Sequence, residues 1–112
     1  MENNDIGFKT DYEEEMVSFK QVSDLQGNVL LEFGAPWCAH CQAAHSVVKE
    51  VLNEYSKLSH IKIYDGKGKR LGRAFKVKLW PTLIILQNGD EIARIVRPLT
   101  PDQVRQLISK VS

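Results

Sequence analysis

Two cysteines three positions apart are the residues of this chain with the clearest chemical potential. Cys38 and Cys41 are the only cysteines among its 112 residues. A secreted disulfide scaffold would distribute several cysteine pairs along the chain, and a structural zinc site needs about four ligands, usually supplied by two such pairs. One isolated Cys-x-x-Cys pair therefore predicts thiol–disulfide chemistry in a reducing compartment.

The surroundings of the pair predict a different role for each cysteine. A thiolate, not a thiol, attacks a disulfide, so the nucleophile needs a site that favours the charged form. Residues 34–36 turn the chain and a helix should begin near Cys38, which places its sulfur beside unpaired N–H groups and the positive end of the helix dipole. Cys41 follows one turn later on the same side. We expect Cys38 to attack the substrate and Cys41 to resolve the mixed disulfide; two inert structural cysteines are the alternative.

A buried strand and an amphipathic helix must hold this pair. Residues 29–33 form an almost wholly apolar run, typical of a strand that is buried on both faces. After Cys38, apolar residues recur at helical spacing as far as Tyr55, which predicts a helix from residue 38 to about residue 58. The strand therefore delivers the pair directly to a helix N-terminus.

The rest of the chain alternates between strand and helix patterns. The predicted strands cover residues 6–8, 61–64, 83–86 and 92–96, and the predicted helices cover residues 11–22, 71–75 and 101–111. Asn88-Gly89 is a strong hairpin signal, and Thr100 with Gln103 forms a capping box around Pro101. This order predicts an α/β fold in which a mixed central β-sheet is flanked by helices on both faces.

Bulk composition narrows the class of protein. Apolar residues make up 43% of the chain and charged residues 26%, which is typical of one globular domain spanning residues 1–112. The net charge of +1 gives no overall attraction to nucleic acid, and no apolar run is long enough to cross a membrane. Without a visible secretion signal, we expect a cytoplasmic monomer that binds neither nucleic acid nor membrane.

Two further groups of residues could bind ligands but have simpler interpretations. Cys38, Cys41 and His45 could share a metal ion, yet a fourth ligand is not evident, so we predict no metal and no cofactor. The basic residues of 67–78 could contact phosphates, but they lack interleaved aromatic residues and form no Walker loop. We interpret this stretch as a solvated basic surface.

Three motifs in a fixed order connect these observations to a known family. Residues 31–41 lead from the buried strand into the cysteine pair, Trp80-Pro81-Thr82 follows, and the Asn88-Gly89 hairpin precedes a closing helix. In this order the chain resembles the thioredoxin family over nearly its whole length. The resemblance implies a thioredoxin fold and a thiol–disulfide oxidoreductase that acts on protein disulfides and is recharged by a reductase or another thiol donor.

The resemblance also implies roles for individual residues. Pro81 is expected to be a cis-proline that faces the cysteine pair, where neighbouring backbone can bind an extended substrate segment. Glu32 matches the family's buried carboxylate behind the second cysteine, where it could exchange a proton with Cys41, and Lys62 matches a lysine near that carboxylate. An outward-facing Glu32 at the surface is the alternative.

Two departures from the family pattern bear on substrate binding and redox potential. The usual Gly-Pro spacer is replaced by Ala39-His40, and His40 is expected to stabilise the Cys38 thiolate and make the protein more oxidising than thioredoxin. Arg97 stands where the family commonly has glycine; it could favour acidic partners, obstruct bulky ones, or simply be solvated. The predicted substrate-binding residues are Trp37, His40, Trp80, Pro81 and Arg97.

The competing hypothesis is a protein-interaction module of the same fold whose redox activity is incidental. Arg97 and the basic stretch motivate it, because they could recruit a partner without chemistry. Both cysteines are present, however, and a purely structural module has no need of them. We therefore favour the enzyme.

Overall fold

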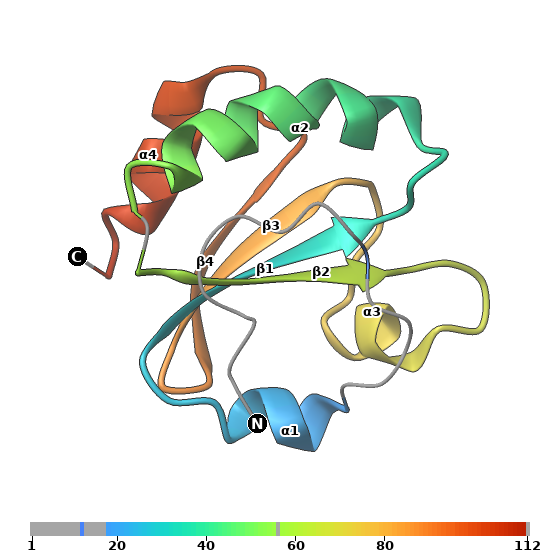
Figure 1. The fold of residues 1–112 in the computed structure, drawn as a ribbon. Helices are drawn as coiled ribbons and strands as arrows, with labels where there is room; N and C mark the ends of the chain where they lie inside the picture. The colour runs from blue at the N-terminus through green and yellow to red at the C-terminus, as the bar shows by residue number, and fades with distance from the viewer. Residues whose placement is uncertain (1–11, 13–17, 56, 112) are drawn as a thin grey trace.

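The computed structural model describes residues 12, 18–55 and 57–111 of the chain. It has a four-stranded mixed sheet with helices on both faces (Figure 1), which confirms the predicted fold class. The strands are β1 (Asn28–Gly34), β2 (Ser59–Tyr64), β3 (Thr82–Gln87) and β4 (Asp90–Val96), and the helices are α1 (Phe19–Ser23), α2 (Ala39–Leu52), α3 (Arg70–Ala74) and α4 (Pro101–Ile108).

The sheet places the strand before the cysteine pair at its centre. The strand order is β2-β1-β3-β4, in which β1 runs parallel to β2 and antiparallel to β3. β3 and β4 form the predicted hairpin, and both of its turn residues have positive φ, 51° at Asn88 and 84° at Gly89. Positive φ at both central residues matches the twist of the flanking strands, which explains why Asn-Gly favours this turn.

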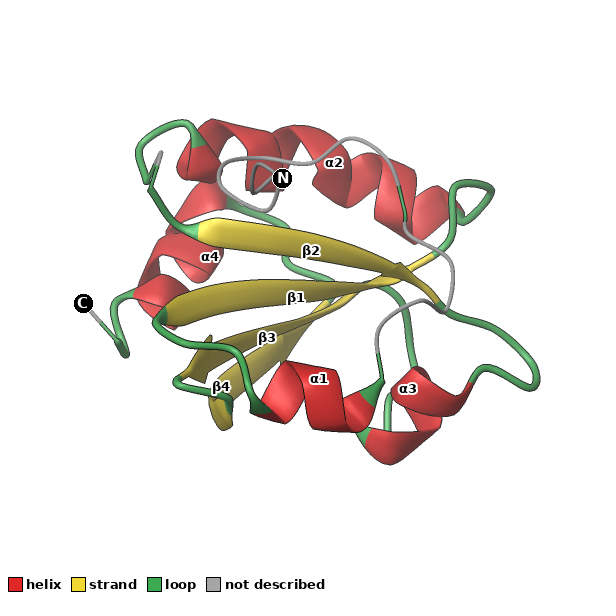
Figure 2. Ribbon diagram, turned by 60° about the horizontal axis from the view of Figure 1, so that its bottom comes forward, coloured by secondary structure: helices red, strands yellow, loops and turns green. Residues whose placement is uncertain are grey.

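Side chains of β1 alternate between two cores, as the strand periodicity requires. Leu31 and Phe33 belong to a cluster that includes residues of α1 and α3, whereas Leu30 belongs to a cluster with residues of α2 and α4. Figure 2 shows α1 and α3 on one side of the sheet and α2 and α4 on the other. Glu32, two residues after Leu30, therefore shares the face of the sheet that α2 covers.

The N-terminal part of the chain is described only in part. The predicted strand 6–8 lies outside the described residues, as does most of the predicted helix 11–22. Where the chain is described, the helix begins at Phe19, because Ser18 is extended and caps it. The Ser18 hydroxyl accepts a hydrogen bond from the Gln21 backbone N–H, and the Gln21 side chain accepts one from the Ser18 N–H. This capping box fixes the start of α1 at Phe19.

The helix after the cysteine pair is shorter than predicted. α2 ends at Leu52 instead of residue 58, and Asn53 is its C-cap. The following backbone forms tight turns, with hydrogen bonds from Glu54 to Val51 and from Tyr55 to Leu52. Tyr55 still packs against the α2–α4 core from this turn, so its apolar contact was correctly anticipated but its helical conformation was wrong. At α4 the predicted capping box of Thr100 and Gln103 is present with Pro101 at the helix start.

Candidate active site

The end of β1 brings the two cysteines to the start of α2. Cys38 is the N-cap residue, and its Sγ accepts a hydrogen bond from the Cys41 backbone N–H at 3.3 Å. Both thiols are free and nearly buried, with 8% of Cys38 and 3% of Cys41 exposed. The Cys38 sulfur thus occupies the position of an N-capping oxygen, where a negative charge is stabilised by N–H groups and by the helix dipole.

Cys41 lies in a site that favours its neutral thiol. Burial, together with a smaller effect of the nearby Cys38 sulfur, raises the pKa of Cys41 to about 11, although hydrogen bonds from the Ala35 backbone and from Tyr12 act in the opposite direction. A thiol with this pKa is protonated at neutral pH. The helix geometry therefore separates one cysteine at the cap from a second cysteine that holds its proton.

Two tryptophans form the exposed rim of the site. Trp37 is 64% exposed; its indole N–H donates to the Tyr64 hydroxyl at 3.3 Å, and its ring meets that of Trp80 edge-on at a centroid distance of 5.4 Å. The Trp80 indole N–H donates to Asp65 at 2.9 Å. Pro81 follows with a cis peptide bond, the conformation that the sequence resemblance implied. Trp80 also packs against the cluster formed by Ala35 and the two cysteines.

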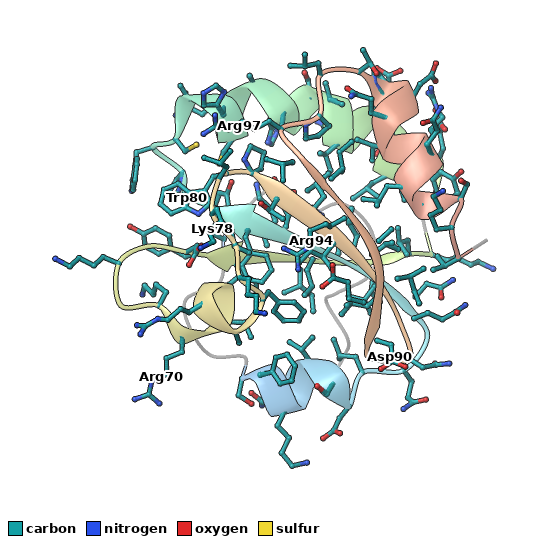
Figure 3. The ribbon with its side chains drawn as sticks, turned by 180° about the vertical axis from the view of Figure 1, so that it is seen from behind. Arg70, Lys78, Trp80, Asp90, Arg94 and Arg97 are labelled. Atoms are coloured by element: carbon teal, nitrogen blue, oxygen red, sulfur yellow. The ribbon has the colours of Figure 1, made fainter. Side chains whose placement is uncertain are left out.

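Arg97 is fixed against this rim by its side chain and its backbone. The guanidinium Nε–H donates to the Trp80 carbonyl at 2.7 Å, and the Arg97 backbone N–H donates to the Pro81 carbonyl at 2.9 Å. Its φ of 52° lies in the left-handed region, which glycine adopts without the cost of about 1 kcal/mol borne by other residues. In Figure 3 Arg97, Trp80 and Lys78 gather at one edge of the molecule, far from Asp90 in the β3–β4 hairpin.

A layer of buried polar residues lies behind the pair. Glu32, His60 and Lys62 are 1%, 0% and 3% exposed, so the surface alternative for Glu32 is wrong. The parallel register places Glu32 opposite Lys62. The carboxylate also meets His60, whose Nε2 lies 2.9 Å from Glu32 Oε1.

Tyr12 closes this layer from the N-terminal segment. The Lys62 ammonium lies 4.2 Å from the centroid of the Tyr12 ring, and the Tyr12 hydroxyl hydrogen-bonds to Cys41. Burial raises the pKa of Tyr12 well above its ordinary value, and the negative charges of Glu32 and Cys41 add to the effect. The phenol is therefore a neutral donor over the whole physiological range.

Comparison with known proteins places this geometry in a family. The sequence model of the thioredoxin family matches residues 10–110. The chain belongs to the thioredoxin family. It is 28% identical over 95 residues to thioredoxin 1 of Nostoc sp., covering 83% of this chain and 89% of the relative, and 31% identical over 84 residues to the thioredoxin of Chlamydia trachomatis, covering 75% and 82%.

A solved structure supports the same assignment. The reduced form of thioredoxin 2 from Pseudomonas aeruginosa is similar, with a TM-score of 0.79 and 42% identity; the match covers 92% of this chain and 99% of that one. Membership of the thioredoxin family makes the chain a thiol–disulfide oxidoreductase. In this thioredoxin-family protein, no helix of the described residues is long and apolar enough to cross a membrane.

The structure brings most of the predicted residues together, but it also adds two that the sequence interpretation missed. The cysteines, the rim of Trp37, Trp80, Pro81 and Arg97, and the layer of Glu32 and Lys62 surround one site, with His40 exposed at the second position of α2. His60 was missed, although strand alternation places it on the same face as Lys62. Tyr12 was also missed, and no local pattern marks it, because only the tertiary fold brings it to Cys41.

The described residues give no support for a metal site. Within residues 12, 18–55 and 57–111, no group of three or more His, Cys, Asp or Glu side chains is arranged to hold an ion. His45, which was considered as a third ligand, lies on α2 beyond Cys41 and is partly buried.

Proposed function

We propose that this protein reduces disulfides of protein substrates by exchanging electrons through Cys38 and Cys41. The observation that carries the proposal is the N-cap position of Cys38, whose sulfur accepts a backbone N–H while the second cysteine lies one turn away. This arrangement gives Cys38 a sulfur suited to attack the substrate disulfide and Cys41 a sulfur suited to attack the mixed disulfide afterwards. The family supports the reaction class, and the cap geometry supports the division of roles.

In the first step the Cys38 thiolate attacks one sulfur of the substrate disulfide. A bond forms between the Cys38 sulfur and that substrate sulfur, the substrate disulfide breaks, and the second substrate sulfur leaves as a thiolate that takes up a proton. N–H groups at the start of α2 stabilise the charge on Cys38 before attack. The product is a mixed disulfide between Cys38 and the substrate.

In the second step Cys41 resolves the mixed disulfide. Cys41 loses its proton and attacks the Cys38 sulfur; the Cys38–Cys41 bond forms, and the first substrate sulfur leaves as a thiolate and is protonated. The substrate gains two electrons and the protein loses two. We assign the buried Glu32 carboxylate the role of accepting the Cys41 proton, with Lys62 and His60 setting the charge around it.

The rim is assigned to substrate binding. Trp37 and Trp80 offer apolar surface, and backbone next to cis-Pro81 is suited to pairing with an extended substrate segment. The Arg97 guanidinium donates a hydrogen bond to the Trp80 carbonyl, and this contact holds a positive charge at the substrate groove. An acidic residue beside the substrate disulfide fits this charge better than a basic one does.

His40 is assigned to tuning the redox potential. It lies in the first turn of α2, where a donated hydrogen bond or a positive charge would stabilise the Cys38 thiolate and thereby the reduced form. Stabilisation of the reduced form makes the potential less negative than about −270 mV, which is typical of thioredoxin. The same proposal includes a cytoplasmic monomer that is recharged by a reductase or another thiol donor.

The alternative is a protein-interaction module of thioredoxin fold, and one observation favours it: Lys67, Lys69, Arg70, Arg73, Lys76 and Lys78 gather in a short segment next to Trp80. Such a surface could recruit a partner without any electron transfer. It does not account for the placement of Cys38 at a helix cap, so the oxidoreductase remains the better explanation.

Reduction of insulin by dithiothreitol separates the two functions. The wild-type protein should accelerate precipitation of the reduced insulin chains, and Cys38→Ser should not. If wild type and Cys38→Ser both fail to accelerate the reaction, the interaction module is the better description.

A further inference from the structure

The Tyr12 hydroxyl and the Cys41 sulfur occupy the same small space above Gly34. A Cβ atom added to Gly34 would lie 2.6 Å from Cys41 Sγ and 3.0 Å from the Tyr12 hydroxyl oxygen. Both atoms thus lie close to the position that the Cβ atom of any other residue at position 34 would occupy. The missing side chain of Gly34 creates the room in which the two groups meet.

The hydrogen bond between them has a defined direction. It lowers the pKa of Cys41 and raises that of Tyr12, as expected when the phenol O–H donates to the sulfur and the bond is strongest to a thiolate. The Tyr12 phenol keeps its own proton, because burial and the charges of Glu32 and Cys41 hold it neutral. Tyr12 is therefore suited to stabilise a charge on Cys41, not to remove its proton.

The ring of Tyr12 is also held in place. The Lys62 ammonium lies over its face at 4.2 Å from the centroid, within the range of a cation–π contact. Lys62 is itself buried at the centre of the polar layer. The hydroxyl is thus presented to Cys41 by a fixed aromatic ring, which reduces the entropy lost when the hydrogen bond forms.

We propose that Tyr12 is a catalytic residue of the resolving step, in which its hydroxyl donates a hydrogen bond to Cys41 Sγ as that sulfur becomes a thiolate. This inference rests on the proposed function, because it needs Cys41 to attack a mixed disulfide. The thiolate forms a bond to the Cys38 sulfur, the bond from Cys38 to the substrate sulfur breaks, and the electron pair leaves with the substrate. The proton lost by Cys41 is balanced by the proton that the substrate thiolate takes up, and Tyr12 is unchanged at the end. In the reverse reaction the same bond would stabilise Cys41 as a leaving group.

The test follows the reduced protein as it reacts with excess 5,5′-dithiobis(2-nitrobenzoate) in a stopped-flow instrument. Attack by Cys38 releases one thionitrobenzoate, and resolution by Cys41 releases the second, so the two steps are seen as separate phases. In Tyr12→Phe the first phase should keep its rate, and the second should slow by about tenfold, since a hydrogen bond to a charged group is lost. The pH at which the second phase reaches half its maximum should rise by about one unit.

Two controls identify the source of any change. Tyr55→Phe removes a hydroxyl from a partly buried tyrosine in the α2–α4 core, away from the cysteines, and should leave both phases unchanged. Thermal unfolding of Tyr12→Phe shows whether the variant is folded. If it is not, Tyr12→Leu, which also lacks a hydrogen-bond donor, is measured in the same way.

The outcomes are separable. A wild-type protein that releases only one thionitrobenzoate would overturn the proposed function itself. A wild type with two phases, together with a Tyr12→Phe second phase of unchanged rate and pH dependence, would overturn the role of Tyr12 alone.

Discussion

The site has a front and a back, which are opposite kinds of surface. The front is the rim of Trp37, Trp80, Pro81 and Arg97, and the back is the buried polar layer of Glu32, His60 and Lys62. At the front, Trp37 is mostly exposed. At the back, Glu32, His60 and Lys62 carry ionisable groups that water hardly reaches. The difference indicates that one side of the site must remain open to a protein substrate, while the other must control a proton without interference from solvent.

The two sides also differ in their energetic cost. Exposed charges and aromatic residues cost little, and exposed ion pairs contribute about 1 kcal/mol or less. Buried ionisable groups are expensive unless each has a partner, and removing one partner exposes that cost. Substitutions at the back should therefore affect stability and proton transfer, whereas substitutions at the front should affect substrate choice and leave the fold intact.

The largest expected effect comes from replacing each of the two cysteines in turn. Cys41→Ser should accumulate mixed disulfides with substrate proteins, because attack by Cys38 is retained and resolution is lost. Cys38→Ser should trap few and should lose essentially all insulin-reducing activity. Non-reducing gels followed by mass spectrometry measure both. The reverse trapping pattern would exchange the assigned roles.

The next effect tests the proton held by Cys41. Its pKa is raised, so the neutral thiol should persist above the pH at which an ordinary cysteine ionises. In Cys38→Ser the contributions of Cys38 are removed, but burial, the largest cause, remains. Alkylation of Cys41 by iodoacetamide at pH 8 should therefore be about tenfold or more slower than that of a free cysteine, rising toward pH 10–11. A rate equal to that of free cysteine would show that the back of the site is open to water.

A third prediction concerns the cost of the buried pair. His60→Leu removes the partner of Glu32 Oε1 and should lower the free energy of unfolding by about 2 kcal/mol, measured by urea denaturation. Replacing both residues by leucine should recover much of that loss, because the Glu32 carboxylate that lost its partner is then absent as well. A double variant as unstable as His60→Leu would mean that packing, not the unpaired charge, causes the loss.

A smaller effect is expected from His40 at the exposed start of α2. His40→Ala should make the reduction potential more negative by about 10–30 mV, which corresponds to up to about tenfold in the equilibrium with glutathione. Lys49→Ala replaces an exposed polar residue of α2 two turns beyond Cys41 and serves as the control. A potential equal to that of wild type, or less negative, would exclude tuning by His40.

The smallest effect concerns charge at the front. Lys67→Gln combined with Lys78→Gln removes two exposed positive charges that line the same pocket as Trp80. Reduction of a disulfide peptide flanked by aspartates should slow about two- to threefold at low salt, and the difference should shrink at 0.5 M salt, where the Debye length is a few ångströms. Lys49→Gln with Lys110→Gln is the matched control away from the rim. Equal slowing of a neutral peptide would contradict a charge effect.

The two sides of the site were also unequally predictable from the sequence. Cys38, Cys41 and Glu32 are marked by local signals: a spacing, a helix start and a carboxylate within an apolar strand. The rest of the polar layer could not be predicted from local signals alone. His60 could have been placed by strand alternation together with the parallel register, but Tyr12 reaches Cys41 only through the tertiary fold.

The ends of the helices were also unequally predictable: an end marked by local signals was predicted correctly, and an end set by tertiary packing was not. The start of α4 is defined by Thr100 and Gln103, which lie three positions apart, and this start was predicted correctly. The end of α2 was wrong because apolar spacing continues to Tyr55, although the backbone leaves the helix after Leu52. A turn that keeps a side chain in the core cannot be distinguished from a helix by periodicity alone.

The edge-on contact of Trp37 with Trp80 has a practical consequence for spectroscopy. These are the only two tryptophans in the chain, and both border the cysteine pair. Intrinsic fluorescence therefore reports this one site and not the molecule as a whole. Oxidation, substrate docking or local opening of the rim should each change the tryptophan emission while the sheet remains intact. The redox cycle can therefore be followed in the native protein without an added fluorescent label. Global unfolding is better followed by circular dichroism of the backbone.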